Sequence, residues 1–484
     1  MELAIPLNPR SSDPLYAQLY EALRQKILSG LLPPGQKLPS TRALADSLNI
    51  SRTTVSLSYE QLISEGYLEP SAGSGTYVSR QLPEELLQPE NQVIHPASNF
   101  HSELSALGKK LAEQGIYDTP PHPGVVPFRH GRPDYTVFPL RTWRRILFRH
   151  CRTLQPEIMD YVSDSRGYLP LREAISKYLG RSRAVHCNAD QIVIVNGSQQ
   201  GLDLVARVLL NSKDRVAVED PGYLGARVAF NAAGAVLQPV PLDDAGIQLV
   251  RLARLKNIRC LYVTPSHQFP GGQVLSLTRR LELLEWAKQN KVWIIEDDYD
   301  SEYRYEGKPI PALQGLDESA SVIYVGTFSK VLYPALRIGY LVVPEILVPV
   351  FARAKWLADR QTPLLEQYAL ADFINEGYLE RHIRKTRKLY NGRRKVLVEV
   401  LRKGFGEKVE IHGENAGMHI LIRFKLKLSD TEIIRRAAEN QITLNSAKSN
   451  YLKDAPSGEF IFGYANLTEQ KIRDGVQKLV RCLL

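Results

Sequence analysis

The side chains with the clearest chemical potential follow short apolar runs in the middle of the chain. Lys330 comes after the run at 322–329, and a lysine amine can bond covalently to a carbonyl carbon. Asp297 closes the run at 292–297, and a buried strand that ends in carboxylates usually aims them at a site. Ser198 opens a helix after a third run, and the N–H groups of a helix start favour a phosphate. The sequence therefore brings three kinds of binding group to strand ends.

These runs belong to an alternating pattern of strands and helices. Five apolar, β-rich runs are separated by amphipathic helical stretches, and this alternation predicts a largely parallel α/β sheet. About the last hundred residues favour a smaller α+β subdomain. The five runs read IVIVNG, RVAVED, IRCLYVTP, VWIIEDD and VIYVGTFS.

The N-terminal part has a different organisation. Apolar residues at period four predict a helix over 14–29, and Ser40 and Ser51 are the expected N-caps of two further helices. Two short extended pieces follow Gly66, around the glycine-rich segment 73–75. Helix, helix, turn, helix and hairpin is the order of a winged helix-turn-helix domain.

Composition places the chain among globular proteins. Its 484 residues correspond to about three domain-sized units, and 44% of them are hydrophobic and 24% charged. No run reaches the roughly 18 apolar residues that a membrane span requires, and the N-terminus lacks a signal-peptide pattern. The four cysteines are widely spaced, which argues against a disulfide framework and against a zinc site. We expect a cytoplasmic protein that holds no metal.

The net charge of +10 does not by itself indicate nucleic-acid binding. Residues 1–80 contain seven Lys/Arg and seven Asp/Glu, so the excess lies in the rest of the chain. The segment 81–125 is acidic, with six Asp/Glu against two Lys/Arg, and it is rich in proline. Such a composition predicts a linker, with one short helix near 102–115.

Five segments follow one another in the larger part of the chain: NGSQQGLDL (from 196), EDPGY (219), TPSHQFPGG (264), EDDYD (296) and GTFSKVLYPALRIGY (326). They resemble the fold-type I aminotransferase pattern and cover most of residues 128–484. The resemblance implies bound pyridoxal 5′-phosphate (PLP), with Lys330 as the Schiff-base lysine. It implies that Asp297 keeps the pyridine nitrogen protonated and that Tyr299 reaches the 3′-oxygen of the ring.

The same resemblance assigns the phosphate end of the cofactor. Arg337 matches the phosphate arginine of the family, and a guanidinium fork suits a dianionic phosphate. Tyr223 is expected to stack on the pyridine face, with a core tyrosine as the alternative. Tyr161 is expected to reach the phosphate of a partner subunit, with plain packing as the alternative. Further phosphate donors are expected at Ser198, Gln199, Thr327 and Ser329.

Two positions depart from the aminotransferase pattern. His267 lies in TPSHQFPGG, where many members have NPxNPTG with an asparagine at the 3′-oxygen, and a histidine can still donate that hydrogen bond. The arginine that clamps the substrate carboxylate is missing near Ile461. Its alternatives in this chain are Lys448, Arg129 and Arg132. PLP binding is therefore better supported by the sequence than efficient transamination.

Residues 14–79 resemble the GntR-type winged helix. In that family the second helix of the turn motif enters the major groove, and the wing lies along the minor groove. A few well-placed cations allow even a neutral domain to read DNA, and a winged helix used for protein contact is the alternative. The resemblance predicts DNA contacts at Ser40, Arg42, Arg52, Thr53, Thr54 and Ser56, and in the wing at Gly73, Ser74, Gly75 and Thr76.

A basic segment at 381–397 carries eight Lys/Arg on a predicted long helix. The pattern favours a solvated face opposite a buried side that contains Leu389 and Val396. A contact of this segment with the DNA backbone is the alternative.

With a GntR-like head, an acidic linker and an aminotransferase-like body, the chain resembles the MocR family of PLP-dependent transcription regulators. This resemblance implies a GntR-type domain over 12–80, a linker over 81–125 and an aminotransferase class I/II-like domain over 126–484. It further implies a homodimer that binds operator or promoter DNA. Such a regulator senses a small amino compound, or PLP itself, through exchange of the Schiff base. The alternative is an active aminotransferase that carries a DNA-binding head.

Overall fold

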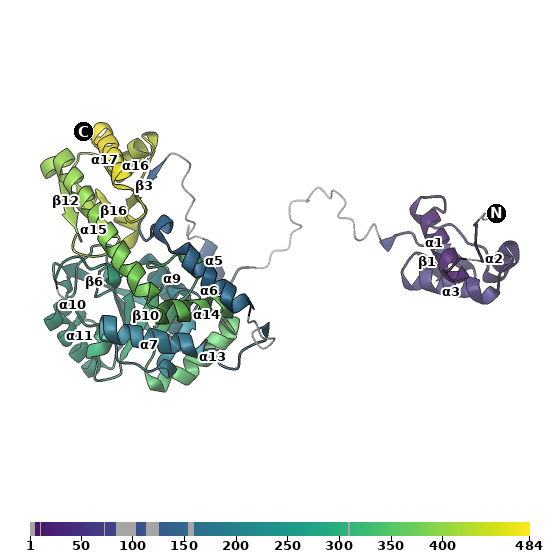
Figure 1. Cartoon of the computed structure of the whole chain (residues 1–484), viewed down its shortest axis with the longest axis horizontal. Coiled ribbons are helices and arrows are strands. Elements are labelled where there is room, and N and C mark those ends of the chain that lie inside the picture. The colour runs from purple at the N-terminus through teal and green to yellow at the C-terminus, as the bar shows by residue number, and fades with distance from the viewer. Residues whose placement is uncertain are drawn as a thin grey trace. The chain divides into compact units, whose positions relative to one another are not determined.

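The computed structural model of the chain divides into two compact units, Met1–Glu103 and Leu104–Leu484 (Figure 1). Most of the predicted linker lies outside the described residues, but helix α5 (Ala106–Ala112) forms inside the stretch predicted as a short helix. No helix in the described part of the chain is long and apolar enough to cross a membrane. The structure describes residues 5–9, 11–71, 73–83, 103–112, 125–152, 159–307 and 310–484.

The N-terminal unit has the helix and hairpin order that the sequence predicts. Leu19, Leu23 and Ile27 are buried along one side of the first helix, as the period of four requires. Asn49, with φ of 51°, makes the tight turn between the second and third helices. The elements are α1 (Leu15–Leu28), α2 (Thr41–Leu48), α3 (Arg52–Ser64) and the antiparallel strands β1 (Leu68–Ser71) and β2 (Gly75–Val78).

An eight-stranded sheet forms the centre of the second unit. Parallel pairing joins β10, β9, β8, β5 and β6, which confirms the predicted α/β class. β11 runs antiparallel to both of its neighbours, and β7 is antiparallel to β6. In sheet order the strands are β4 (Ile192–Val195), β11 (Gly339–Val342), β10 (Val322–Thr327), β9 (Trp293–Asp298), β8 (Ile258–Val263), β5 (Arg215–Asp220), β6 (Val236–Asp243) and β7 (Gly246–Ile247).

Alternate residues of a central strand enter different cores, which explains the uninterrupted apolar runs in the sequence. Ile192 and Ile194 of β4 pack in the core that contains α7 (Leu169–Arg183), whereas Val193 and Val195 pack in the core that contains α8 (Ser198–Leu209). Burial on both faces is typical of parallel sheets. Other helices of this unit are α6 (Leu140–Arg152), α9 (Leu224–Ala232), α10 (Leu249–Leu252), α11 (Leu277–Asn290), α12 (Leu313–Leu316), α13 (Val348–Asp359) and α14 (Leu364–Asn375).

The long helix α15 (Tyr378–Phe405) leads from this sheet to the predicted α+β subdomain (Figure 1). A four-stranded sheet forms there, and α15 packs against the last helix of the chain. The short strand β3 (Val126–Pro127) pairs with β14 (Ile442–Thr443), which ties the start of the unit to this subdomain. The subdomain contains β12 (Val409–His412), β13 (His419–Phe424), β15 (Asn445–Ser446), β16 (Glu459–Gly463), α16 (Asp430–Glu439) and α17 (Glu469–Leu483).

Helix α15 corrects one expectation about its basic residues. Val396 is buried and Leu389 half-buried, as predicted, but Arg393 and Arg394 are buried as well. The basic residues therefore do not all lie on a solvated face. The buried charge of Arg393 is compensated by the buried Asp134, whose Oδ2 lies 2.7 Å from Nη2 of the arginine.

The Arg393–Asp134 pair stabilises the fold in a pH-dependent way. Burial by itself raises the pKa of Asp134, but hydrogen bonds from Thr136 and Arg393 outweigh it and leave the pKa below its ordinary value. A lowered pKa contributes stability that is present above the unfolded pKa and is lost as the pH falls through the folded one.

Arg393→Ala should leave Asp134 as a buried carboxylate without its cation. We expect the free energy of unfolding to fall by about 3–5 kcal/mol at neutral pH, and by less in acid, measured by denaturant unfolding followed by circular dichroism. Arg402→Ala on the same helix removes an exposed pair with Glu414 and should cost about 1 kcal/mol or less. Equal losses for the two variants would contradict a stabilising buried pair.

Candidate functional site

The parallel pairing of β9 with β10 brings the main candidate residues to one edge of the sheet. Asp297 lies opposite Val325 in this pairing, and Lys330 follows three residues after the end of β10. The Lys330 amine donates to the backbone oxygen of Gly131 at 3.2 Å. A Cβ atom at Gly131 would lie 2.5 Å from that amine, so a side chain at this position would displace the amine.

The environment of Lys330 shifts the amine toward its neutral, nucleophilic form. Burial lowers the pKa of the amine, against the raising effects of Asp300 and Asp297. The positive charge of Arg132 lowers this pKa further. Arg132 therefore contributes a positive charge to the surroundings of the lysine.

Asp297 presents one carboxylate oxygen that lacks a partner. Its Oδ2 accepts a hydrogen bond from the hydroxyl of Tyr262 at 2.7 Å, whereas Oδ1 is buried without a hydrogen-bond partner among the described residues. Burial raises the pKa of Asp297 to about 7. A protonated pyridine nitrogen would satisfy this oxygen and favour the ionised carboxylate.

His267 and Tyr299 meet beside this carboxylate. His267 Nδ1 lies 3.0 Å from the Tyr299 hydroxyl and 3.1 Å from Oδ1 of Asp300, while its Nε2 is buried with no partner in the described part of the chain. If Nδ1 carries the proton toward Asp300, Nε2 offers a lone pair, or a proton when the ring is charged. A Cβ at Gly417 would come into the imidazole, so a glycine keeps this space for His267.

The start of α8 and the turn that contains Arg337 form a candidate anion site, called here the anion cradle. Arg337 has φ of 52° and donates from Nη2 to the backbone oxygen of Asn196 at 2.7 Å. A Cβ at Gly197 would lie 2.6 Å from the same Nη2, so the guanidinium passes directly over the residue before the helix. Ser198 is the first residue of α8, where the free N–H groups of a helix face an anion.

The remaining predicted phosphate donors are arranged differently. Thr327 and Ser329 are buried, and Thr327 Oγ1 accepts from the Ser329 N–H at 3.1 Å. Gln199 directs its side-chain amide to the Gly225 oxygen at 2.8 Å, which leaves only its backbone N–H for an anion. Thr327 and Ser329 thus lie on the turn just before Lys330.

The two other predicted tyrosines have separate environments. Tyr223 is half-buried and meets Phe269 edge-on, with ring centroids 5.8 Å apart, and burial raises its pKa to about 12. Tyr161 is 70% exposed, and the guanidinium of Arg360 lies 4.9 Å from its ring centroid. Within this chain Tyr161 is therefore free to face a second molecule.

No arginine occupies the place of the carboxylate clamp near Ile461 in β16. Ile461 is buried, and Lys448 is exposed on the turn before β16. The segment with Arg129 lies against β16, since a Cβ at Gly463 would meet the Arg129 oxygen. Of the alternatives, Arg132 is the one whose charge lowers the pKa of Lys330.

Several contributors to the site were missed in the sequence. Tyr262 lies on β8, the strand before the one that ends in Asp297. Because β8 and β9 were predicted as consecutive parallel strands, their pairing could have indicated that Tyr262 lies near Asp297. His419 comes from β13 of the C-terminal subdomain, and its ring lies 4.9 Å from that of His267, a proximity that no local motif announces. His267, Asp300 and His419 offer ligand atoms within 4.8 Å of one another. Because Asp300 also accepts from the Met418 N–H, we interpret these groups as a hydrogen-bonded wall of the site.

The second candidate site lies in the N-terminal unit. Arg42, Arg52 and Thr53 are exposed at the starts of α2 and α3. Ser40 accepts from the Ala43 N–H at 3.2 Å as the N-cap of α2, so its hydroxyl already has a structural partner. The Thr54 hydroxyl lies 2.8 Å from that of Ser51, and Ser56 is half-buried.

The wing follows these helices as a short antiparallel hairpin. Gly73 and Gly75 have φ of 77° and 115°, values that glycine adopts without strain. Ser74 at the tip is exposed and Thr76 is half-buried. The predicted contact residues of the wing are thus at or beside its exposed end.

Comparisons with known proteins divide the chain in the same way. The family model for aminotransferase class I and II matches residues 153–479, and the model for bacterial regulatory proteins of the gntR family matches 15–78. The probable rhizopine catabolism regulatory protein MocR of Rhizobium meliloti is 40% identical over 97% of this chain and 94% of its own length. The pyridoxine biosynthesis transcriptional regulator PdxR of Corynebacterium glutamicum is 31% identical over 98% of this chain and 96% of its own.

Solved aminotransferases share the fold of the larger unit. Kynurenine aminotransferase of Pyrococcus horikoshii has a TM-score of 0.69 at 29% identity, covering 81% of this chain and 98% of that protein. LysN, an α-aminoadipate aminotransferase of Thermus thermophilus complexed with N-(5′-phosphopyridoxyl)-L-leucine, has a TM-score of 0.69 at 28% identity, covering 78% of this chain and 94% of that protein.

The fold and the two matched regions define a DNA-binding transcription regulator with a gntR-type winged helix and an aminotransferase-like domain. The chain belongs to the MocR family of such regulators. The aminotransferase class I and II fold implies dependence on PLP.

Asp297→Asn tests the penalty of the buried carboxylate in the protein without cofactor. The ordinary pKa of Asp297 is 3.8 and its folded pKa is about 7, so its stability contribution is complete below the first value and is lost as the pH rises through the second. We expect the variant to raise the Tm at about pH 8 and to change it little at about pH 4.

The exposed Asp244→Asn is the matched control and should leave the Tm unchanged at both pH values. A lower Tm for Asp297→Asn at the higher pH would contradict the claim that the ionised, buried carboxylate of Asp297 destabilises the protein without cofactor.

Proposed function

We propose that this regulator binds PLP covalently at Lys330 and senses a small amino compound, or PLP itself, through exchange of that covalent link. The observation that carries the proposal is the convergence of three groups at one sheet edge. They are the Lys330 amine, the Oδ1 of Asp297, which has no partner among the described residues, and the anion cradle of Arg337 at the start of α8. This set matches the carbonyl, ring nitrogen and phosphate of PLP.

Bound PLP supplies an electrophilic carbonyl and, when its ring nitrogen is protonated, a sink for electrons. Asp297 would hold the proton on that nitrogen, with Tyr262 fixing the other carboxylate oxygen. His267 Nε2 and Tyr299 would contact the 3′-oxygen, and Tyr223 would stack on the ring. The backbone N–H groups of Ser198 and Gln199, with Thr327, Ser329 and Arg337, would hold the phosphate.

The DNA-binding role extends to particular residues. We assign major-groove contact to Arg52, Thr53, Thr54 and Ser56, with Arg42 and Ser40 beside them at the start of α2. An arginine that binds guanine through two hydrogen bonds contributes about 1–3 kcal/mol of discrimination. The wing residues Gly73, Ser74, Gly75 and Thr76 would follow the minor groove.

The proposal includes a homodimer and the domain limits 12–80, 81–125 and 126–484. The exposed ring of Tyr161 supports the dimer, because it is available to the phosphate of a partner subunit. An amino compound that binds one arrangement of the dimer more tightly shifts DNA affinity by that difference, typically about 1–3 kcal/mol.

An active aminotransferase with a DNA-binding head is the second candidate. The aminotransferase neighbours and the lowered pKa of Lys330 favour it. The apolar Ile461 at the usual place of the carboxylate clamp argues against efficient turnover. Steady-state assays with amino acids distinguish the two, since a turnover near about 10 per second would favour the enzyme.

Lys330→Ala should abolish the visible absorption of protein-bound PLP while leaving the fold intact, because the only amine expected to bond to the cofactor is gone. Absorbance after gel filtration and mass spectrometry after borohydride reduction measure this. The exposed Lys288→Ala should retain full absorbance and a reduced adduct. An adduct that survives in Lys330→Ala would overturn the assignment.

Arg52→Ala should weaken operator binding about tenfold, corresponding to about 1.4 kcal/mol, without altering the PLP spectrum. Gel-shift titrations at one fixed salt concentration provide the measurement. Lys26→Ala, on α1 and outside the predicted contact set, is the charge-matched control. Unchanged binding by Arg52→Ala refutes the role of Arg52 in DNA recognition.

A further inference from the structure

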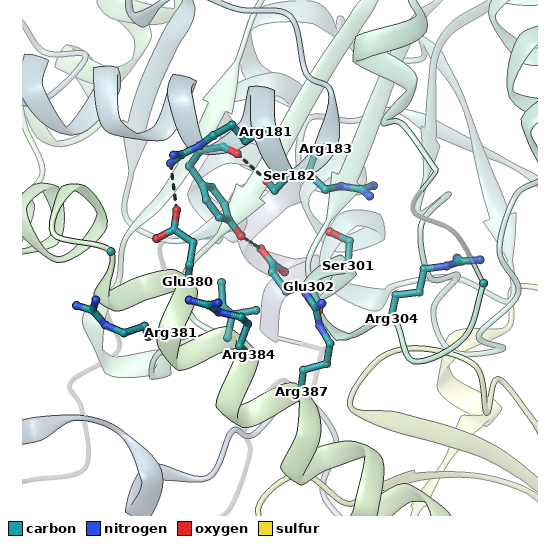
Figure 2. A pocket seen from close by; sticks show the side chains of 14 residues that line it. Arg181, Ser182, Arg183, Ser301, Glu302, Arg304, Glu380, Arg381, Arg384 and Arg387 are labelled. Carbon is teal, nitrogen blue, oxygen red and sulfur yellow. Dashed lines mark hydrogen bonds and ion pairs between the residues drawn. The ribbon is translucent and has the colours of Figure 1, made fainter.

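A cavity of about 810 Å³ lies apart from the cofactor site, between the end of α7, the turn at 301–307 and the first part of α15. Figure 2 shows arginines reaching it from both helices and from the turn. The arginines that line the cavity are Arg181, Arg183, Arg304, Arg381, Arg384 and Arg387.

The cavity carries far more positive than negative charge. Among the described residues, its only acidic lining residues are Glu302 and Glu380. Glu380 pairs with Arg181 at 3.0 Å (Figure 2), and burial raises the pKa of Glu302 to about 7, so Glu302 is only partly ionised at neutral pH. Carboxylates therefore cancel little of the charge inside the cavity.

Four of the six arginines have no ion-pair partner among the described residues: Arg304, Arg381, Arg384 and Arg387. The pairs that the other two form are with Glu380 and Asp298. Arg304 Nε is buried without a hydrogen-bond partner in the described part of the chain, and Arg387 Nε donates to the backbone oxygen of Glu302 at 2.7 Å.

The buried part of this arrangement, at Arg304, is unfavourable without an anion, whereas Arg381, Arg384 and Arg387 are exposed to solvent. Burial and the nearby charge of Arg183 lower the pKa of Arg304. Several guanidinium groups around one hollow repel one another, and an unsatisfied buried donor adds its desolvation cost. An anion with several oxygen acceptors removes both costs at once.

We propose that this cavity is a second ligand site, which binds a soluble anion with two or more phosphate groups. Guanidinium groups match phosphate oxygens in pairs, and four arginines without an ion-pair partner in the described part of the chain exceed what one carboxylate can use. The volume lies within the range of about 300–1,000 Å³ that small-molecule sites occupy. DNA presents its phosphates along the outside of a rod, whereas these arginines surround a hollow.

One arginine connects this cavity to the neighbourhood of the cofactor site. Arg183 donates from Nε to Oδ2 of Asp298 at 2.7 Å, and its Nη2 bonds to the Ser266 hydroxyl. Asp298 and Ser266 directly adjoin Asp297 and His267 in the sequence. The proposed site nevertheless uses none of the PLP-binding residues, so it stands independently of PLP binding.

The test is isothermal titration of the full-length protein with sodium tripolyphosphate at low salt. We expect wild-type protein to bind the probe and Arg384→Gln to weaken binding about tenfold or more, because a charged donor is removed. Arg304→Gln provides a second lining variant, from a different element. Lys388→Gln, an exposed change of equal charge on α15 outside the cavity lining, should retain wild-type affinity. Arg337→Gln reports any binding of the probe at the separate anion cradle of α8.

Circular dichroism establishes that each variant is folded before titration. Absence of binding by the wild type, or equal affinity for Arg384→Gln and Lys388→Gln, would overturn the proposal. Tripolyphosphate affinity that falls in Arg337→Gln alone would assign the binding to the cofactor phosphate cradle and equally overturn it. If a short DNA duplex of unrelated sequence binds in an Arg384-dependent way while tripolyphosphate does not bind, the cavity contacts DNA phosphates and the small-anion proposal is wrong.

Discussion

A carboxylate held away from water determines much of the arrangement around the candidate cofactor site. Asp297 ends a central strand, and Tyr262 satisfies one of its oxygens while the other has no partner among the described residues. A buried carboxylate of this kind favours protonation or a cationic neighbour. The register of β9 and β10 fixes where such a neighbour can lie, because it brings the turn with Lys330 to the same sheet edge. The amine and the carboxylate are thereby placed around one space.

Asp298, the next residue in the same acidic run, has its pKa shifted in the opposite direction. Burial alone raises the pKa of Asp298, but Arg183 and the hydroxyls of Ser301 and Tyr324 outweigh it and hold the pKa below its ordinary value. Successive strand residues point to opposite faces of a sheet, so one carboxylate faces the cofactor side while the other anchors α7 through Arg183. The acidic run therefore supplies one carboxylate to each face of the sheet.

Local signals in the sequence predicted the elements well, and long-range contacts were the limit. Apolar runs with β-branched residues located β4, β5, β8, β9 and β10, since strands buried on both faces have no polar alternation to obscure them. Ser40 and Ser51 were recognisable as helix caps because their hydroxyls act within three residues. His419 and Gly131 were not recognisable, because each reaches the site from a segment far away in the chain. Arg393 was assigned to a basic face for the same reason, since its partner Asp134 lies outside α15.

The distinction between a sensor and an enzyme depends on what the site does with the rest of its ligand. A nucleophilic lysine is useful to both, because each must exchange one amine for another. Rapid turnover also requires the substrate to be oriented, and a carboxylate clamp supplies much of that orientation. Here β16 offers the buried Ile461, and the cation whose charge lowers the pKa of Lys330, Arg132, comes from a different segment. A site that can exchange its amine but orients it by other means can still report binding, because a coupling of about 1–3 kcal/mol changes DNA affinity roughly 5- to 150-fold without any turnover. Precise orientation of the bound amine is therefore a requirement for a catalyst, but it is not a requirement for a site that only reports binding.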